Sequence, residues 1–256
     1  CILVDRSNIY DEIYDLQQGI YGTDGKGKIR VLANRYDGID LPDNACRILI
    51  LDSLPFFSNM GDMYEERARG ESRLIQKKIA QKIEQGLGRS VRGEKDYCCI
   101  IIIGSELVSF IRSSATRNFF SVQTQKQIEI GLQMTEWIKE DEDNVTMNTL
   151  INQCLKRDEG WKEYYEDEMN GIEIIQHIRE EEFNILLSEQ KAEQMFLQKR
   201  YDEAANVIQK IIDGMENKND RGWYLQLKAY YKYFSSKLES QKLQKSAFQN
   251  NYEMLK

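Results

Sequence analysis

The sequence is poor in the residues on which several classes of site depend. It has one histidine, His177, among 256 residues, so a histidine-based metal centre or a Ser-His-Asp triad has little support. Two prolines and 16 glycines argue against a loop-rich chain and favour long regular elements. No apolar run approaches the ~18–20 residues that span a bilayer, and the N-terminus lacks a signal-peptide pattern. We therefore expect a cytoplasmic protein with no membrane partner and no metal site of its own.

Cysteine is present, but without the spacing of a disulfide framework. The five cysteines fit free thiols in a reducing compartment. Cys98 and Cys99 are adjacent within an apolar run, where free cysteine usually behaves as a small hydrophobic residue. A disulfide or metal role is the less favoured alternative for them.

The net charge of −7 is unevenly distributed. Residues 1–140 hold 19 Lys+Arg and 20 Asp+Glu, whereas residues 141–256 hold 16 and 22. Between residues 61 and 95 there are nine basic and six acidic side chains. A local basic face can bind phosphate in an acidic protein, because charges act mainly within about a Debye length, ~8–10 Å. The overall acidity therefore does not exclude a nucleic-acid partner.

The first part of the chain alternates strand-like and helix-like segments. Four apolar runs have the length of strands: residues 1–4, 29–33, 47–52 and 97–104. Three segments have helical patterns: residues 9–19, 63–86 and 124–137. This alternation predicts a parallel sheet covered by helices on both faces, with the last and most apolar strand in a central position.

The second part reads as helical throughout. The acidic run at 139–144 has no apolar anchors and is interpreted as a solvated linker. Beyond it, apolar residues recur at helical spacing, and the helix pairs resemble one or two tetratricopeptide-like hairpins without a clean repeat period. A plain helical bundle is the alternative. We thus expect an α/β domain over residues 1–140 and an all-α accessory domain over residues 141–256.

One phosphate-binding motif is incomplete. Gly22 to Lys28 satisfies Gly-x-x-x-x-Gly-Lys, but Ile29 follows where a P-loop has Ser or Thr. The next segment is strand-like, whereas the motif requires a helix N-terminus facing the phosphates. We interpret this stretch as a flexible turn.

A more specific pattern begins at Gln85 and reads Gln-x-x-Gly-Arg-x-x-Arg. Arg89 and Arg92 are three residues apart, on one face of a helical turn. Gly88 precedes the first arginine and allows close approach to the backbone. Two forked guanidinium groups presented together suit a phosphate-rich ligand.

A second block, Ala33 to Pro42, contains Asp37-Gly-Ile-Asp40 after a predicted strand. Taken together, the two blocks resemble two motifs of superfamily 2 helicases in the branch typified by XPD and DinG. The Asp37-Gly-Ile-Asp40 block resembles motif V, and the arginine block resembles motif VI. Members of that branch follow the Gly-Ile-Asp turn with an apolar strand ending in Leu-Pro-Phe, which matches Leu54 to Phe56. The Asp-Tyr that precedes the next strand of the family matches Asp96-Tyr97. The resemblance covers residues 1–104 and extends weakly to residue 139.

The resemblance implies a second RecA-like domain that completes an ATP site held mainly by a first RecA-like domain. Arg89 and Arg92 would reach the γ-phosphate, and Gln85 would orient the phosphate or the attacking water. Gly38, Asp40 and Gly88 would lie on the nucleotide side of the site, with Gly38 and Asp40 linking nucleotide state to the bound strand. ATP and Mg²⁺ would be held mainly by the missing half, because this sequence has no complete Walker A loop and no Asp-Glu box.

The same resemblance implies contacts with nucleic acid. Asn34 and Arg35 stand where such proteins approach the strand backbone, although Arg35 could equally form a salt bridge with Asp37 or Asp40. The basic segment from Arg67 to Lys82, which includes Arg69, Arg73 and Lys77, could track phosphates. Its alternative is a solvated helix face balanced by nearby glutamates. The tryptophans and tyrosines of the second part could stack bases, although their helical spacing is more typical of a core.

We therefore expect the C-terminal motor half of an ATP-dependent helicase or translocase, an ATP hydrolase that binds single-stranded or duplex DNA, with RNA not excluded. The start at Cys1 without a methionine indicates an N-terminally truncated domain, which alone should not hydrolyse ATP. The alternative is a non-catalytic, helicase-like scaffold whose helical tail recruits a partner protein. A motor that feeds a nuclease is a third option, but no nuclease-type carboxylate cluster is evident.

Overall fold

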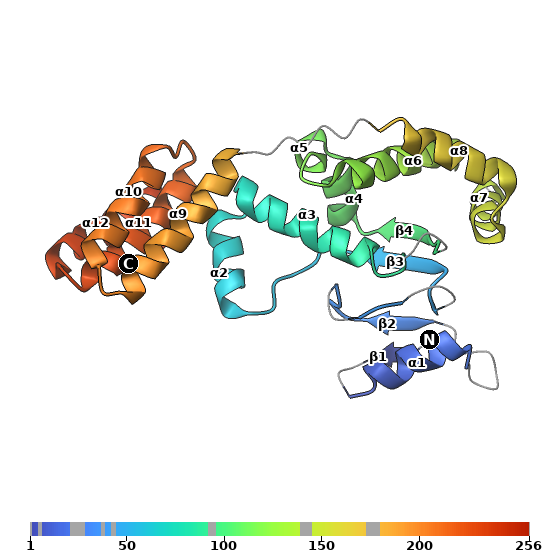
Figure 1. The fold of residues 1–256 in the computed structure, drawn as a ribbon, viewed down its shortest axis with the longest axis horizontal. Coiled ribbons are helices and arrows are strands. Elements are labelled where there is room, and N and C mark those ends of the chain that lie inside the picture. Colours follow the sequence, from blue (N-terminus) through green and yellow to red (C-terminus); the bar gives the residue numbers. More distant parts are fainter. Residues whose placement is uncertain are drawn as a thin grey trace. The chain divides into compact units, whose positions relative to one another are not determined.

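The computed structural model describes residues 2–4, 7–20, 29–36, 39–41, 45–91, 96–138, 145–172 and 180–255. The chain forms two compact units (Figure 1). The first comprises Cys1–Phe56 and Lys77–Ile174, and the second comprises Phe57–Gln76 and Ile175–Lys256. A short segment from the first half of the chain is therefore part of the second unit. The predicted boundary at residue 140 stays a prediction.

Parallel strands form the α/β part of the first unit. Strand β1 (Ile2–Val4) pairs with β2 (Arg30–Leu32), and β3 (Ile48–Asp52) pairs with β4 (Cys99–Ile103). Helix α1 (Ile9–Gln18) lies between β1 and β2 in the sequence, as parallel pairing requires. The prediction of an α/β region with parallel strands, followed by an all-helical region, is confirmed.

The position predicted for the last strand is wrong. Among the described residues β4 pairs with β3 alone, and its side chains are half-buried or exposed. The four described strands form two separate pairs. Apolar composition identified the strand but could not show which of its faces a helix covers. The two pairs share one cluster of buried side chains, which includes Val4, Ile39, Leu41 and Cys46.

Helix α1 has the boundaries that its sequence predicts. Ile9 and Leu16 are buried, seven residues apart on one face. Gly19 ends the helix in the left-handed region, with φ 67°, and its N–H bonds to the carbonyl groups of the last turn. Glycine favours this conformation because it has no β-carbon.

The long basic helix predicted over residues 63–86 is two helices, so that prediction is wrong. Helix α2 (Met60–Arg69) begins after Asn59, whose side chain accepts a hydrogen bond of 2.7 Å from the Asp62 N–H. Helix α3 (Arg73–Leu87) follows after Gly70 and two further residues. The Ser72 N–H donates to Arg69 O at 2.8 Å, which closes the turn between the two helices. The boundary between the compact units lies within α3.

The described residues of the first unit form five further helices after β4. They are α4 (Ser105–Arg112), α5 (Ser114–Arg117), α6 (Val122–Ile138), α7 (Val145–Lys156) and α8 (Glu159–Asn170). Helices α4 and α7 contact β4, while α6, α7 and α8 contact one another. The helix predicted over 124–137 is confirmed as α6. The predicted linker at 139–144 and the glycine-rich turn at 22–28 lie outside the described residues.

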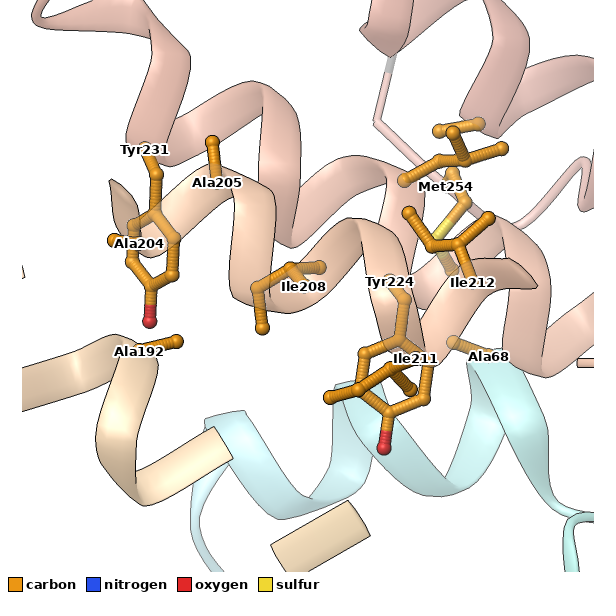
Figure 2. Packing of buried hydrophobic residues seen from close by; sticks show 12 residues of the cluster. Ala68, Ala192, Ala204, Ala205, Ile208, Ile211, Ile212, Tyr224, Tyr231 and Met254 are labelled. Atoms are coloured by element: carbon orange, nitrogen blue, oxygen red, sulfur yellow. The ribbon is translucent and has the colours of Figure 1, made fainter. Parts of the chain in front are cut away.

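The second unit is helical. It contains α2 and the four helices α9 (Glu180–Leu197), α10 (Tyr201–Asp213), α11 (Lys218–Tyr233) and α12 (Lys237–Asn250). Successive helices among the last four pack against one another. Their core contains Ile208, Ile212 and Tyr224, together with Ala68 from α2 (Figure 2). Tyr224 and Tyr231 are buried in it, so these two rings are core residues and cannot stack on bases.

Among the helices that the structure describes, none combines the length and apolarity needed to cross a bilayer.

Candidate functional site

The segments that carry both sequence motifs meet at the carboxyl ends of the strands. The chain leaves β2 after Leu32, and α3 ends at Leu87, just before Arg89. In parallel sheets this edge is where ligands bind. We call this group of side chains the strand-end site; it comprises Asn34, Tyr36, Asp40, Phe56, Lys82, Gln85, Gly86 and Arg89.

Arg89 joins the two motifs directly. Its Nε donates to Tyr36 O at 2.8 Å and to Gln85 O at 3.0 Å. Its Nη1 donates to Ile39 O at 2.9 Å and forms an ion pair with Asp40 at 3.4 Å. The Arg89 carbonyl accepts a hydrogen bond of 3.0 Å from the Leu41 N–H. One guanidinium group therefore binds the backbone both at Tyr36 and at Ile39.

The closest packing in the site is between Tyr36 and Gly86. Tyr36 is buried, and a β-carbon built on Gly86 would lie 2.5 Å from its Cδ1. By contrast, a β-carbon on Gly88 would lie 3.4 Å from Glu84 O, an ordinary contact. Sequence reasoning emphasised Gly88 and missed Gly86. The available signal was a glycine inside a helical pattern, which indicates a packing requirement.

Tyr36 also links the site to the end of β3. Its hydroxyl donates to Ser53 O at 3.4 Å. Burial, and then the nearby Asp52 carboxylate, raise the pKa of Tyr36 above its ordinary value, so the phenol stays protonated at neutral pH. Ser53 has a positive φ of 68°. A β-carbon on Gly104, at φ 92°, would lie 2.9 Å from Ser53 N, so this close approach of β3 and β4 requires glycine.

Asn34 and Lys82 converge on the turn after β3. The Asn34 Nδ2 donates to Phe56 O at 3.1 Å, and the Lys82 Nζ donates to the same oxygen at 2.9 Å. The Asn34 Oδ1 is buried without a hydrogen-bond partner. The sequence predicts Lys82 only as part of the basic segment, whereas the structure places its side chain in the strand-end site.

The structure describes some of the other predicted site residues and not others. Arg92 and Gly38 lie outside the described residues, so their roles stay predictions. Gln85 and Gly88 are exposed, and Arg35 is partly exposed. The ion pair of Asp40 with Arg89 does not decide between the two interpretations of Arg35.

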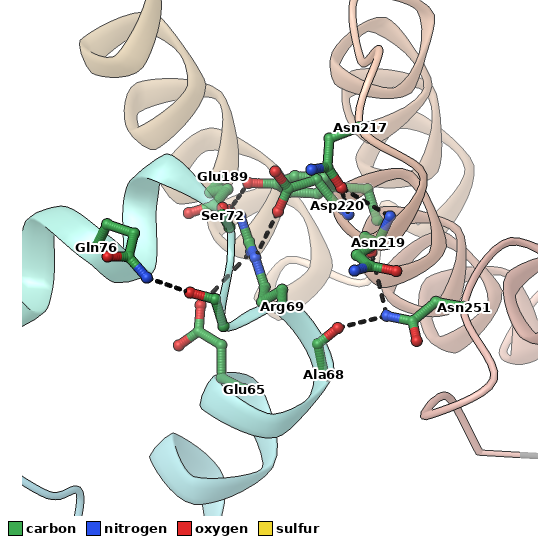
Figure 3. Close-up of polar contacts among 12 residues, drawn as sticks. Glu65, Ala68, Arg69, Ser72, Gln76, Glu189, Asn217, Asn219, Asp220 and Asn251 are labelled. Atoms are coloured by element: carbon green, nitrogen blue, oxygen red, sulfur yellow. Dashed lines mark hydrogen bonds and ion pairs between the residues drawn. The ribbon is translucent and has the colours of Figure 1, made fainter. Parts of the chain in front are cut away.

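One of the basic residues of α2 does not lie on the surface. Arg69 is 1% exposed, and its Nε forms an ion pair of 2.8 Å with Asp220 (Figure 3). It therefore cannot track phosphates, and its inclusion in a basic face is wrong. Arg73 and Lys77 both lie on α3. Arg73 belongs to the second unit and pairs with Glu182 at 3.3 Å, and Lys77 belongs to the first unit.

The chemistry of the strand-end site suits an anion. Its donors are the guanidinium of Arg89, the ammonium of Lys82 and the amide of Asn34, groups that bind phosphate oxygens well and that here bond carbonyl oxygens of the chain. In the part of the chain that the structure describes, no three His, Cys, Asp or Glu residues are placed to hold a metal ion.

Comparison with protein families gives one match. The family described as helicase C-terminal domain matches residues 18–126, a segment that contains every residue of the strand-end site. No curated protein and no solved structure matches the chain.

Proposed function

We propose, from the premise that residues 18–126 are a helicase C-terminal domain of the XPD and DinG type, that this chain is the C-terminal motor half of an ATP-dependent helicase or translocase. It would complete an ATP site whose larger part, with Mg²⁺, belongs to a first RecA-like domain. DNA, single-stranded or duplex, is the proposed substrate.

The observation that carries the proposal is the contact of Arg89 with the Tyr36–Asp40 segment. The residue assigned to γ-phosphate recognition binds Tyr36 O, Ile39 O and Asp40, and Asp40 is one of the residues assigned to linking nucleotide state to the bound strand. A guanidinium group that stabilises charge on a transferring phosphoryl group can accelerate transfer by ~10³–10⁵. If Arg89 shifts toward a phosphate, the segment bound to it must also move. This connection is a physical route from nucleotide state to strand binding.

The other site residues take supporting roles in this proposal. Arg92 would supply the second guanidinium group, and Gln85 would orient the attacking water. Gly38, Asp40 and Gly88 would line the nucleotide side. Nucleic-acid contacts by Asn34, Arg35, Arg73 and Lys77 would be chiefly to phosphates, and hence salt-sensitive and weakly selective for sequence.

The test is DNA-stimulated ATP hydrolysis by the full-length protein. Arg89→Ala and Arg92→Ala should each lower kcat by several hundred-fold, with little change in nucleotide affinity, because the larger half of the site binds ATP. Arg112→Ala is the matched control, since Arg112 is exposed on α4 and should leave turnover unchanged. Unchanged kcat in Arg89→Ala and Arg92→Ala would refute the assignment.

A second candidate is a non-catalytic scaffold whose helical region recruits a partner protein. It is favoured by one observation, namely that Nε and Nη1 of Arg89 already bind carbonyl oxygens of the chain itself. A structural role would account for such an arginine. Absence of DNA-stimulated ATP turnover in the unaltered full-length protein would favour this candidate.

A further inference from the structure

Four free thiols lie in the described part of the first unit: Cys46, Cys98, Cys99 and Cys154. Cys46 is 9% exposed and belongs to the buried cluster shared by the two strand pairs. Cys98 is half-buried and packs against that cluster. The Cys46 thiol donates to Ile48 O at 3.4 Å and the Cys98 thiol to Cys99 O at 3.5 Å, and the two thiols are close enough for each to shift the pKa of the other. Neither residue belongs to the strand-end site.

The backbone brings these two cysteines to the same end of the β3–β4 pair, where both strands begin. Ile48 aligns with Cys99 in the parallel register, and the Cys99 N–H donates to Arg47 O at 2.9 Å. Cys46 therefore lies two residues before β3 and Cys98 one residue before β4, which is an offset of one residue. Neighbouring strands are ~4.8 Å apart and rise ~3.3 Å per residue, which gives a Cα separation of about 6 Å. That separation is within the range of disulfides.

Side-chain contacts hold the two segments together. The Arg47 Nη1 donates to Tyr97 O at 3.0 Å, and its guanidinium lies 3.9 Å from the centre of the Tyr97 ring. Neither cysteine is part of a regular strand, and both side chains contact the same buried cluster, in which Cys46 is a member and Cys98 packs against it. Little backbone movement is therefore needed to join the two sulfur atoms.

We propose that Cys46 and Cys98 are a site of reversible oxidation, at which hydrogen peroxide converts the two thiols into an intrachain disulfide. The Cys98 thiolate attacks one peroxide oxygen and breaks the O–O bond, giving a sulfenic acid and hydroxide. The Cys46 sulfur then attacks the Cys98 sulfur and displaces its hydroxyl group, and the Cys46 proton leaves in water. Two thiols and one peroxide thus give one disulfide and two water molecules. A small dithiol reverses the step by thiol–disulfide exchange.

The surroundings of the four thiols make Cys98 the first to react. The interaction with the nearby Cys46 thiol lowers the pKa of Cys98 to about 7, and the positive charge of Arg47 contributes to this lowering. The same interaction, and then burial, raise the pKa of Cys46. Burial, followed by the charge of Cys154, raises the pKa of Cys99 to about 11, and burial also raises that of Cys154. Because the thiolate is the nucleophile, Cys98 attacks peroxide and Cys46 resolves the sulfenic acid.

The experiment is peroxide titration of the full-length protein at pH 7, followed by maleimide blocking and tryptic peptide mapping. The sequence predicts tryptic peptides 36–47, containing Cys46, and 96–112, containing Cys98 and Cys99. One disulfide-linked pair of these two peptides should form, and dithiothreitol should release it. Cys46→Ser and Cys98→Ser should each abolish the linked pair. Cys99→Ser and Cys154→Ser, the matched controls, should retain it.

Three results would overturn the proposal. They are a linked pair that survives in Cys98→Ser, accumulation of sulfinic acid at Cys98 in the unaltered protein without a disulfide, and thiols that remain free after peroxide treatment. The last two results are measured on the unaltered protein, so a serine variant that folds poorly does not obscure them.

Discussion

The ring of Tyr36 lies so close to Gly86 that a β-carbon at position 86 would be 2.5 Å from Cδ1 of the ring. Tyr36 comes from the segment after β2, and Gly86 lies in the last turn of α3. Real β-carbons do not approach other atoms this closely. The close fit therefore depends on glycine at position 86, which sets the distance between the two motif segments.

Gly86→Ala should destabilise the protein. In an unobstructed helix, alanine is favoured over glycine by ~1 kcal/mol. Here the added methyl group must displace the Tyr36 ring, and overpacking of a core typically costs ~1–3 kcal/mol. We expect a lower free energy of unfolding, measured by urea denaturation.

Gly88→Ala is the matched control for that variant. Its β-carbon would lie 3.4 Å from Glu84 O, so we expect a change within ~0.5 kcal/mol. In the Tyr36→Ala background, Gly86→Ala should lower the free energy of unfolding much less, because the ring that the added methyl group would displace is absent. Equal effects of Gly86→Ala in both backgrounds would contradict the proposed clash.

Arg69→Met should cost ~3–5 kcal/mol of stability. Arg69 and Asp220 form a buried ion pair at 2.8 Å, and Glu65 and Ser72 also contact the guanidinium (Figure 3). Removing one partner leaves the Asp220 carboxylate buried without its counter-charge. The measurement is the free energy of unfolding from urea denaturation, followed by a signal from the second unit such as Trp223 fluorescence.

Arg67→Met tests whether burial of the ion pair is the reason for the loss of stability expected in Arg69→Met. Arg67 lies on the same helix and pairs with Glu253 at 2.7 Å, but its side chain is 76% exposed. Exposed ion pairs contribute ~0–1 kcal/mol, so this variant should be close to the unaltered protein. A loss as large as that of Arg69→Met would show that the basic charge of α2, rather than the buried pair, determines stability.

Arg89→Ala should destabilise the first unit in addition to its effect on ATP turnover. Tyr36 O and Ile39 O lose a donor, and an unsatisfied buried carbonyl costs ~1–3 kcal/mol. Arg89→Lys should recover only part of the lost stability, because an ammonium group cannot reproduce the planar, forked set of N–H donors of a guanidinium group. Thermal unfolding with Arg112→Ala as control would measure this. An unchanged Tm in Arg89→Ala would mean that these contacts do not stabilise the Tyr36–Asp40 segment.

Truncation after residue 174 should expose α2. Within the second unit, Ala68 is 2% exposed in the helical core, its carbonyl accepts a hydrogen bond from Asn251, and the Tyr64 hydroxyl donates to Gln226 at 3.1 Å. We expect amide hydrogen exchange in α2 to increase by at least two orders of magnitude, because a lone helix of this length is marginal in water. The amides of β3 and β4 serve as the internal reference. Unchanged protection of α2 would show that it does not depend on α9–α12.

Much of the secondary structure could be predicted from the sequence. The left-handed Gly19 that ends α1, the apolar runs of β3 and β4, and the helical spacing of α10 all depend on residues close together in the chain. The break between α2 and α3 could not be predicted, because charged residues continue through it. The turn between the two helices accompanies the burial of Arg69 against Asp220, which lies 151 positions later in the sequence.

The sequence by itself determined the four strands and the parallel α/β character of the first part, the helical character of the second part, and the two motifs that indicate a helicase C-terminal domain. It could do so because periodicity, turn residues and motif spacing are local properties of the chain. Only the tertiary structure decided that α2 belongs to the helical unit, that Gly86 rather than Gly88 accommodates Tyr36, and that Arg89 binds the Tyr36–Asp40 segment. These relationships depend on which segments far apart in the sequence contact each other in the fold. Side-chain packing and the pairing of buried charges determine those contacts.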